Sequence, residues 1–187
     1  GIKSELGNGV KKVKSFTEKP AGDHIWINAG YFVCEPEVFD NIDKEDSIIF
    51  EKGGLKIGVF GVGVELKGLV PGRLYGESKW LDPIEIANER AAELKLKGCD
   101  LVICLSHLGY EYGTDKVSDR VLANKTKDIH LIIGGHTHTF LSEPTQEKNL
   151  LGETVLINQV GWAGINLGRI DFEIDSRSLA KYDVIEV

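Results

Sequence analysis

The sequence predicts an α/β fold with a parallel β-α-β-α-β core and an antiparallel C-terminal extension. Three apolar runs, at residues 55–62, 100–105 and 130–133, are typical of buried strands, and the segments between them carry apolar residues at helical spacing. Right-handed crossovers would make these strands parallel and place both helices against the sheet. Histidines follow the second and third runs, at the edge where open α/β sheets bind ligands.

Two helices are predicted in this core. Asp82 is the expected N-cap of the first helix, Pro83 its first residue and Gly98 its end. Its apolar stripe consists of residues three or four positions apart: Ile84, Ala87, Ala91 and Leu94. The second helix is expected to begin near Thr114 or Asp115, with three apolar residues facing the core: Val117, Val121 and Leu122.

The C-terminal extension is predicted from two strand-like runs, residues 154–160 and 167–174. The link between them, residues 161–164, is so short that we expect the two strands to pair antiparallel. Residues 181–187 are expected to form a last strand.

The first fifty residues have a different pattern. Residues 10–17 and 25–34 are predicted to form two strands around a turn-rich stretch, and residues 36–42 a short helix. We therefore divide the chain into two predicted domains, residues 1–50 and 51–187.

Composition and charge exclude several classes of protein. The chain has 187 residues, of which 42% are hydrophobic and 27% charged, ordinary values for a globular domain. Its formal net charge of −7 argues against nucleic acid as a partner. No apolar run approaches the ~18 residues of a membrane span, so no membrane partner is expected. The sequence also shows no signal peptide and no Cys-x-x-Cys pair.

Three histidines are the candidate functional residues. His107 lies in a Ser-His-Leu-Gly stretch, and His136 and His138 lie in Gly-Gly-His-Thr-His. Imidazole is the commonest metal-binding side chain, and three of them could hold one Zn²⁺ with water in the fourth position. The structural alternative is that they are ordinary loop residues. We interpret His130 and His24 in that ordinary way.

Residues from about 49 to 174 resemble the calcineurin-like metallophosphoesterases, in particular the bacterial 5′-nucleotidase type. The matching stretches are GLKIGVFG at 54–61, LSHLG at 105–109, GGHTHTF at 134–140 and NQVG at 158–161. The resemblance implies half of that family's sandwich fold and hydrolysis of phosphate monoesters such as nucleoside 5′-monophosphates. It also implies a centre of two divalent ions, Zn²⁺, Mn²⁺ or similar, with His107 and His136 on one ion and His138 on the other.

The family's other metal ligands are acidic and come from the beginning of its catalytic domain. We find none of those motifs upstream of Leu55, and the nearest candidate, Gly22-Asp23-His24, lacks the Asp-x-His spacing. The chain therefore resembles the second half of the catalytic domain, and we expect it to hold one ion or none and to be catalytically incomplete. One sheet face would then lie bare, which favours a homo-oligomer or a complementing chain.

Residues from about 9 to 51 resemble a different family, the glucose-1-phosphate cytidylyltransferases. The matching stretches are VKSFTEKP at 13–20, WINAGYFV at 26–33 and EPEVFD at 35–40. This resemblance implies vestigial sugar-phosphate contacts by Glu18, Lys19 and Asn28, while the nucleotide-binding glycine-rich loop of that family is absent.

Two unrelated resemblances in one chain favour a chimera of two α/β proteins. The alternatives to a phosphomonoesterase origin are a non-catalytic hybrid that binds at most one metal ion and, ranked last, a sugar-1-phosphate nucleotidyltransferase. The first resemblance suggests the bacterial periplasm as the location, and the second the cytoplasm.

Overall fold

The computed structural model describes residues 3–7, 10–15, 47–173 and 178–186. The predicted strand at 25–34, the predicted helix at 36–42 and the candidate contacts Glu18, Lys19 and Asn28 lie outside the described residues. The chain divides into two compact units, Gly1–Lys44 and Glu45–Val187. The predicted division between residues 50 and 51 falls within a strand of the second unit.

The described part of the first unit is a β-hairpin. Strand β1 (Lys3–Gly7) pairs antiparallel with β2 (Val10–Ser15). The second of these strands corresponds to the predicted strand at 10–17, whereas β1 was not predicted.

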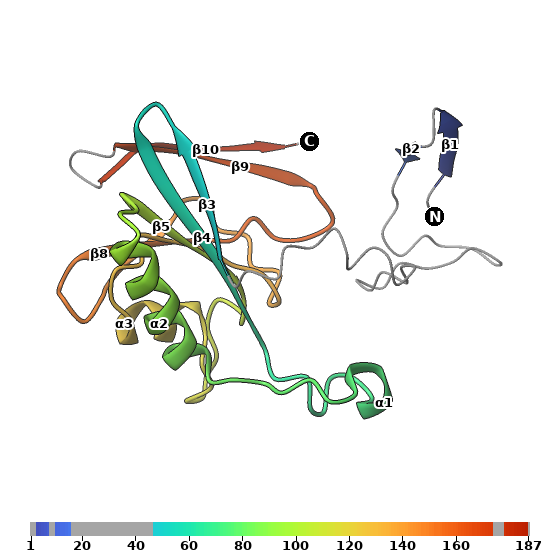
Figure 1. Ribbon diagram of the computed structural model, residues 1–187, viewed down its shortest axis with the longest axis horizontal. Coiled ribbons are helices and arrows are strands. Elements are labelled where there is room, and N and C mark those ends of the chain that lie inside the picture. The colour runs from blue at the N-terminus through green and yellow to red at the C-terminus, as the bar shows by residue number, and fades with distance from the viewer. Residues whose placement is uncertain (1–2, 8–9, 16–46, 174–177, 187) are drawn as a thin grey trace. The chain divides into compact units, whose positions relative to one another are not determined.

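A six-stranded sheet forms the centre of the second unit (Figure 1). Its four inner strands are parallel, and an antiparallel strand closes each edge. The predicted parallel α/β core is therefore confirmed. In spatial order the strands are β3 (Ser47–Lys52), β4 (Leu55–Gly63), β5 (Leu101–His107), β6 (Leu131–Ile133), β8 (Thr154–Asn158) and β7 (Thr145–Lys148).

The pairing predicted for the C-terminal extension is wrong. Strand β8 continues the parallel sheet beside β6, and β9 (Asn166–Glu173) pairs antiparallel with β10 (Ser178–Glu186) instead. The side chains of β8 on both faces of the sheet are buried, as expected of an inner parallel strand rather than of one arm of a hairpin. Strand β10 corresponds to the predicted last strand.

The main predicted helix is confirmed as α2 (Pro83–Leu96). The Asp82 carboxylate caps it by accepting hydrogen bonds from the backbone N–H groups of Ile84 and Glu85, at 2.8 and 3.1 Å. A short helix that was not predicted, α1 (Gly72–Tyr75), precedes it. None of the described helices is long and apolar enough to span a membrane.

The second helix, α3 (Asp119–Lys125), begins four residues later than predicted. Ser118 is its N-cap, since its hydroxyl accepts a hydrogen bond from the backbone N–H of Val121. The predicted start at Thr114 or Asp115 is therefore wrong, because Ser118 supplies the capping side chain and the helix begins only after it.

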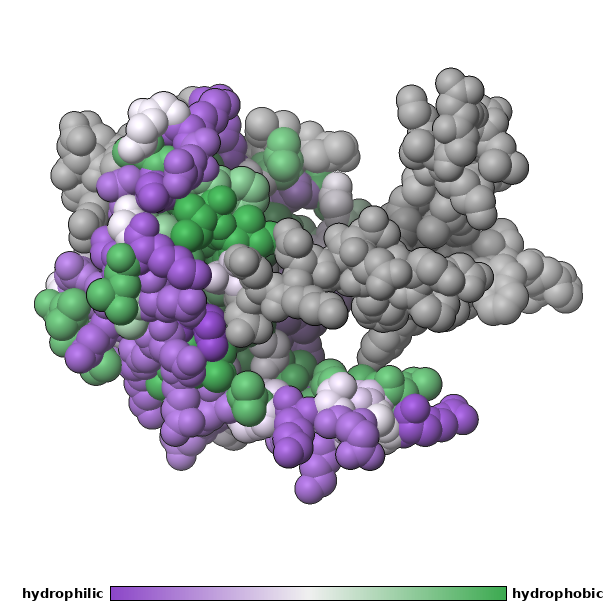
Figure 2. Space-filling view, in the orientation of Figure 1, coloured by the Kyte–Doolittle hydropathy of each residue, from purple (hydrophilic) through white to green (hydrophobic). Residues whose placement is uncertain are grey.

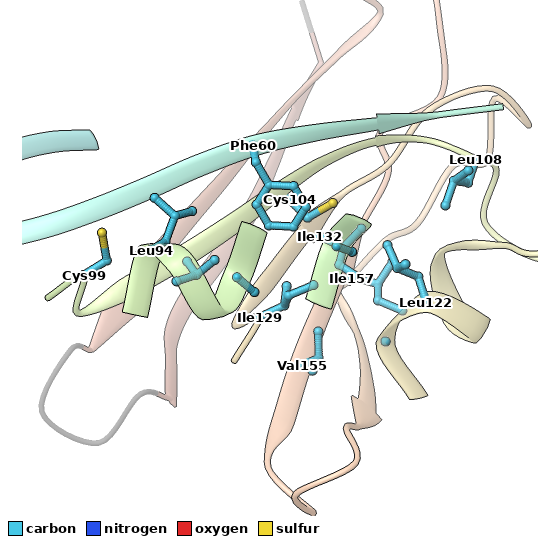
Figure 3. Packing of buried hydrophobic residues seen from close by; sticks show 14 residues of the cluster. Phe60, Leu94, Cys99, Cys104, Leu108, Leu122, Ile129, Ile132, Val155 and Ile157 are labelled. Carbon is cyan, nitrogen blue, oxygen red and sulfur yellow. The ribbon is translucent and has the colours of Figure 1, made fainter. Parts of the chain in front are cut away.

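The hydrophobic core lies between the two helices and one face of the sheet (Figure 3). Leu94 of α2 packs toward β4, where an ideal Cβ at Gly58 would lie only 2.8 and 2.9 Å from its two methyl carbons. A glycine at this position therefore allows the close approach of α2 to the sheet. Phe60 and Cys104 are buried on the same face.

The opposite face of the sheet leaves large apolar side chains in contact with solvent. Ile48 and Phe50 of β3 are 50% and 56% exposed, and Leu105 and Ile133 are 47% and 42% exposed. Figure 2 shows hydrophobic side chains gathered on the visible surface of the described residues. The helices therefore cover one face of the six-stranded sheet, and the opposite, apolar face is only partly covered.

Candidate metal centre

Two of the predicted histidines meet at the carboxyl ends of neighbouring strands. His107 is the last residue of β5, and His136 follows β6 after two glycines. Strands β5 and β6 are parallel neighbours, with Leu105 opposite Ile133, so the residues that follow both strands reach the same edge of the sheet. The two imidazole rings lie edge to face, with centroids 5.2 Å apart and an interplanar angle of 65°.

This separation fits two ligands of a single ion. With Zn–N bonds of about 2.0–2.1 Å and a tetrahedral angle at the metal, the centres of two coordinating imidazoles lie about 5 Å apart. The observed 5.2 Å between the ring centroids of His107 and His136 is close to that spacing.

Burial and nearby positive charge favour the neutral form of one of the two rings. Burial lowers the pKa of His136 below its usual value, and the positive charges of His107, Lys116 and His138 lower it further. Neutral imidazole is the form that coordinates a metal, so proton competition at His136 is weakened.

The third predicted ligand lies against another partner. His138 stacks on the ring of Trp162, with centroids 5.9 Å apart and an interplanar angle of 12°. In the part of the chain that the structure describes, no group of three or more His, Cys, Asp or Glu side chains is arranged to hold a metal ion. The structure thus brings two of the three candidates together, and a site that includes His138 stays a prediction.

A hollow of about 550 Å³ borders His107 on the apolar face of the sheet. It lies over the ends of β4, β5 and β6, where glycines of β4 leave space for a small ligand. Its lining residues are Gly61, Val62, Gly63, Leu105, Ser106, His107 and Ile133.

A buried carboxyl group lies beneath the two histidine loops, and sequence reasoning missed it. Asp119 of α3 is 0% exposed and its Oδ1 accepts a hydrogen bond from the hydroxyl of Ser106, the neighbour of His107. Its Oδ2 has no hydrogen-bond partner and lies where a Cβ at Gly134 would be. Burial raises the pKa of Asp119 to about 6, although the Ser106 hydrogen bond opposes the shift. The only sequence signal was the Ser118-Asp119 pair, which is also ordinary at a helix start.

A buried amide, Gln159, was also missed. It follows β8 and makes hydrogen bonds to the loop that carries His136 and His138. Its only signal was its place in the NQVG stretch.

The chain is similar in sequence and in fold to nucleotide phosphoesterases. The trifunctional nucleotide phosphoesterase YfkN of Bacillus subtilis is 30% identical over 160 residues, which cover 81% of this chain and 10% of that protein. The crystal structure of a 5′-nucleotidase precursor from Thermus thermophilus matches with a TM-score of 0.60 and 27% identity, covering 75% of this chain and 29% of that one. No protein-family model matches the chain.

A second similarity covers a short part of the chain. The glucose-1-phosphate cytidylyltransferase of Salmonella typhimurium is 53% identical over 34 residues, or 18% of this chain and 13% of that protein. Both predicted resemblances are therefore confirmed, and the mixed α/β sheet is similar to the calcineurin-like phosphoesterase fold. The chain spans only a small part of the length of each of these relatives.

Proposed function

We propose that the second unit derives from a metal-dependent phosphomonoesterase of the 5′-nucleotidase type and that His107 and His136 hold one divalent ion. The observation that carries this proposal is the 5.2 Å separation of the two rings at adjacent strand ends. The substrate class that we propose is nucleotide phosphomonoesters. The nucleotide phosphoesterases to which the chain is similar support this proposal.

The residues of this chain contribute binding and orientation. His107 and His136 would supply one imidazole ligand each to the ion, and the hollow beside His107 has room for a phosphate group. When bound, divalent ions supply such centres with positive charge that stabilises the phosphoryl oxygens during displacement.

We further propose that turnover by these residues alone is low. Two ions held ~3.5–4 Å apart need ligands that offset their mutual repulsion, and a bridging carboxylate usually does this. In the described residues His138 stacks on Trp162 and is not grouped with His107 and His136. The missing carboxylates would come from a further segment, a complementing chain or a second copy of this chain.

The origin and location of the protein are part of the same proposal. Residues 1–50 derive from a cytidylyltransferase, with Glu18, Lys19 and Asn28 as vestigial sugar-phosphate contacts, and the whole chain is a chimera. This is supported by the short match to the Salmonella enzyme. We propose a periplasmic or extracellular location, supported by the precursor among the structural neighbours.

The test compares metal binding with hydrolysis. The purified chain is titrated with Zn²⁺ and Mn²⁺, then assayed with AMP and with a chromogenic phosphate ester. We expect one bound ion per chain, lost in His107→Ala and in His136→Ala, and little hydrolysis. His24→Ala, which removes a histidine from the other compact unit, is the matched control and should bind normally. Binding that survives both site substitutions would refute the proposal.

A further inference from the structure

The loop that carries His136 and His138 has an unusual backbone. Both histidines have positive φ angles, of 74° and 54°, in the left-handed region that residues with a Cβ rarely occupy. Two such residues separated by one position are unfavourable unless surrounding contacts fix them.

One buried side chain makes hydrogen bonds on either side of both histidines. Gln159 is 1% exposed, and its Nε2 donates to the carbonyl oxygen of Gly135 at 2.9 Å. Its Oε1 accepts from the hydroxyl of Thr137 at 3.2 Å and from the backbone N–H of Thr139. The three contacted residues alternate with His136 and His138, so a single carboxamide brackets both left-handed positions.

The same contacts extend to the loop that follows His107. The backbone N–H of Tyr110 donates to the Thr137 hydroxyl at 2.9 Å, and the Thr137 and Thr139 hydroxyls are 2.9 Å apart. Gln159 is thereby connected through Thr137 to the segment three residues beyond His107. A group that both donates and accepts is required here, since Gly135 offers an acceptor and Thr139 a donor.

We propose that Gln159 is a positioning residue of the metal centre: its carboxamide fixes the two left-handed turns and so aims the His136 ring at His107. This inference rests on the proposed function, in which those two histidines share an ion. Gln159 itself is not a ligand in this account and touches neither substrate nor metal.

The first test substitutes Gln159→Met, which keeps the length and volume of the side chain and removes all three hydrogen bonds. We expect the affinity for Co²⁺ or Zn²⁺ alone to fall by roughly 10- to 100-fold, the usual effect of removing a group that orients a metal ligand. Gln146→Met is the matched control, because Gln146 is exposed on β7 of the same sheet. Thr126→Val, which removes a buried hydrogen bond to Leu122 in α3, controls for general loss of stability.

The second test needs no metal. In the metal-free protein, amide hydrogen exchange of residues 135–139 should accelerate in Gln159→Met but not in either control, and ring-to-ring contacts between His107 and His136 should weaken in NMR spectra. Thr137→Val is the variant to use if Gln159→Met does not fold. It removes only the hydroxyl link and should weaken metal binding by about two- to tenfold.

The outcomes separate the two proposals. Wild-type protein that binds metal through His107, together with unchanged affinity in Gln159→Met, would overturn the positioning role and leave the proposed function standing. Wild-type protein that binds no metal would refute the proposed function, and the metal-free exchange and ring contacts would then decide the role of Gln159 in the loop. An equal loss of metal affinity in Gln159→Met and in Thr126→Val would also overturn the positioning role of Gln159, since the loss would then come from general destabilisation.

Discussion

Replacing Asp119 by Asn should make the protein more stable at neutral pH. The wild-type carboxyl is fully buried and only one of its oxygens has a hydrogen-bond partner, so its ionised form is poorly solvated. Asparagine keeps an oxygen that can accept from Ser106 and removes the charge. Above its pKa, the buried carboxylate of Asp119 therefore lowers the free energy of unfolding.

The magnitude follows from the pKa. Burial raises the pKa of Asp119 from 3.8 to about 6, and a shift of about two units corresponds to roughly 3 kcal/mol. The folded state holds the proton more tightly than the unfolded state does. Unfolding therefore releases a proton between about pH 4 and pH 6, and the free energy of unfolding falls as pH rises through that window. Above about pH 6–7 the ionised, buried Asp119 lowers the free energy of unfolding by this full amount.

The assay is urea unfolding from pH 4 to pH 7.5 for wild type, Asp119→Asn and Asp115→Asn, an exposed carboxyl four residues away that serves as control. The difference in the free energy of unfolding between Asp119→Asn and wild type should grow with pH by up to about 3 kcal/mol. Any loss of hydrogen bonding in the variant would lower that difference by the same amount at every pH. A difference that does not change with pH, or that shrinks as pH rises, would refute the reasoning.

Three further predictions concern the fold and the site. Gly58→Ala should lower the free energy of unfolding by roughly 1–3 kcal/mol because its Cβ would crowd Leu94, and in a Leu94→Ala background this loss should shrink to the part that comes from Cys99 Sγ, 3.0 Å from the same Cβ. If urea unfolding shows that the free-energy losses of Gly58→Ala and Leu94→Ala simply add in the double variant, this explanation is wrong. Asp82→Ala removes the cap of α2 and should cost about 1 kcal/mol, measured by thermal unfolding. Burial and nearby positive charge lower the pKa of His136, so its ring should titrate at a lower pH than a free imidazole when followed by NMR in the metal-free protein, and a midpoint at or above the free value would contradict this.

Much of the fold could be predicted from local sequence signals. The cap at Asp82, Pro83 and the apolar stripe define α2, and the apolar runs define the inner strands. The place of β8 could not be predicted, because the short Gly161–Gly164 link suggested a hairpin with the next strand, whereas β8 lies between β6 and β7 in the sheet. Strand β7 was missed since its sequence, TQEK, is polar and lies at the edge of the sheet.

The site was predictable only in part. The histidines stand out by type and by their place after strands, and the parallel order of β5 and β6 brings His107 beside His136. The stacking of His138 on Trp162 and the buried Asp119 depend on packing between segments distant in sequence. No periodicity or motif spacing records such contacts.

The most direct test of this account is a Co²⁺ titration of the chain, followed by its visible absorption spectrum, in wild type and in the His107→Ala, His136→Ala double variant. We predict one ion per wild-type chain with nitrogen ligation and no specific binding in the double variant. Equal binding by both proteins, or none by wild type, would contradict the claim that these two imidazoles share an ion.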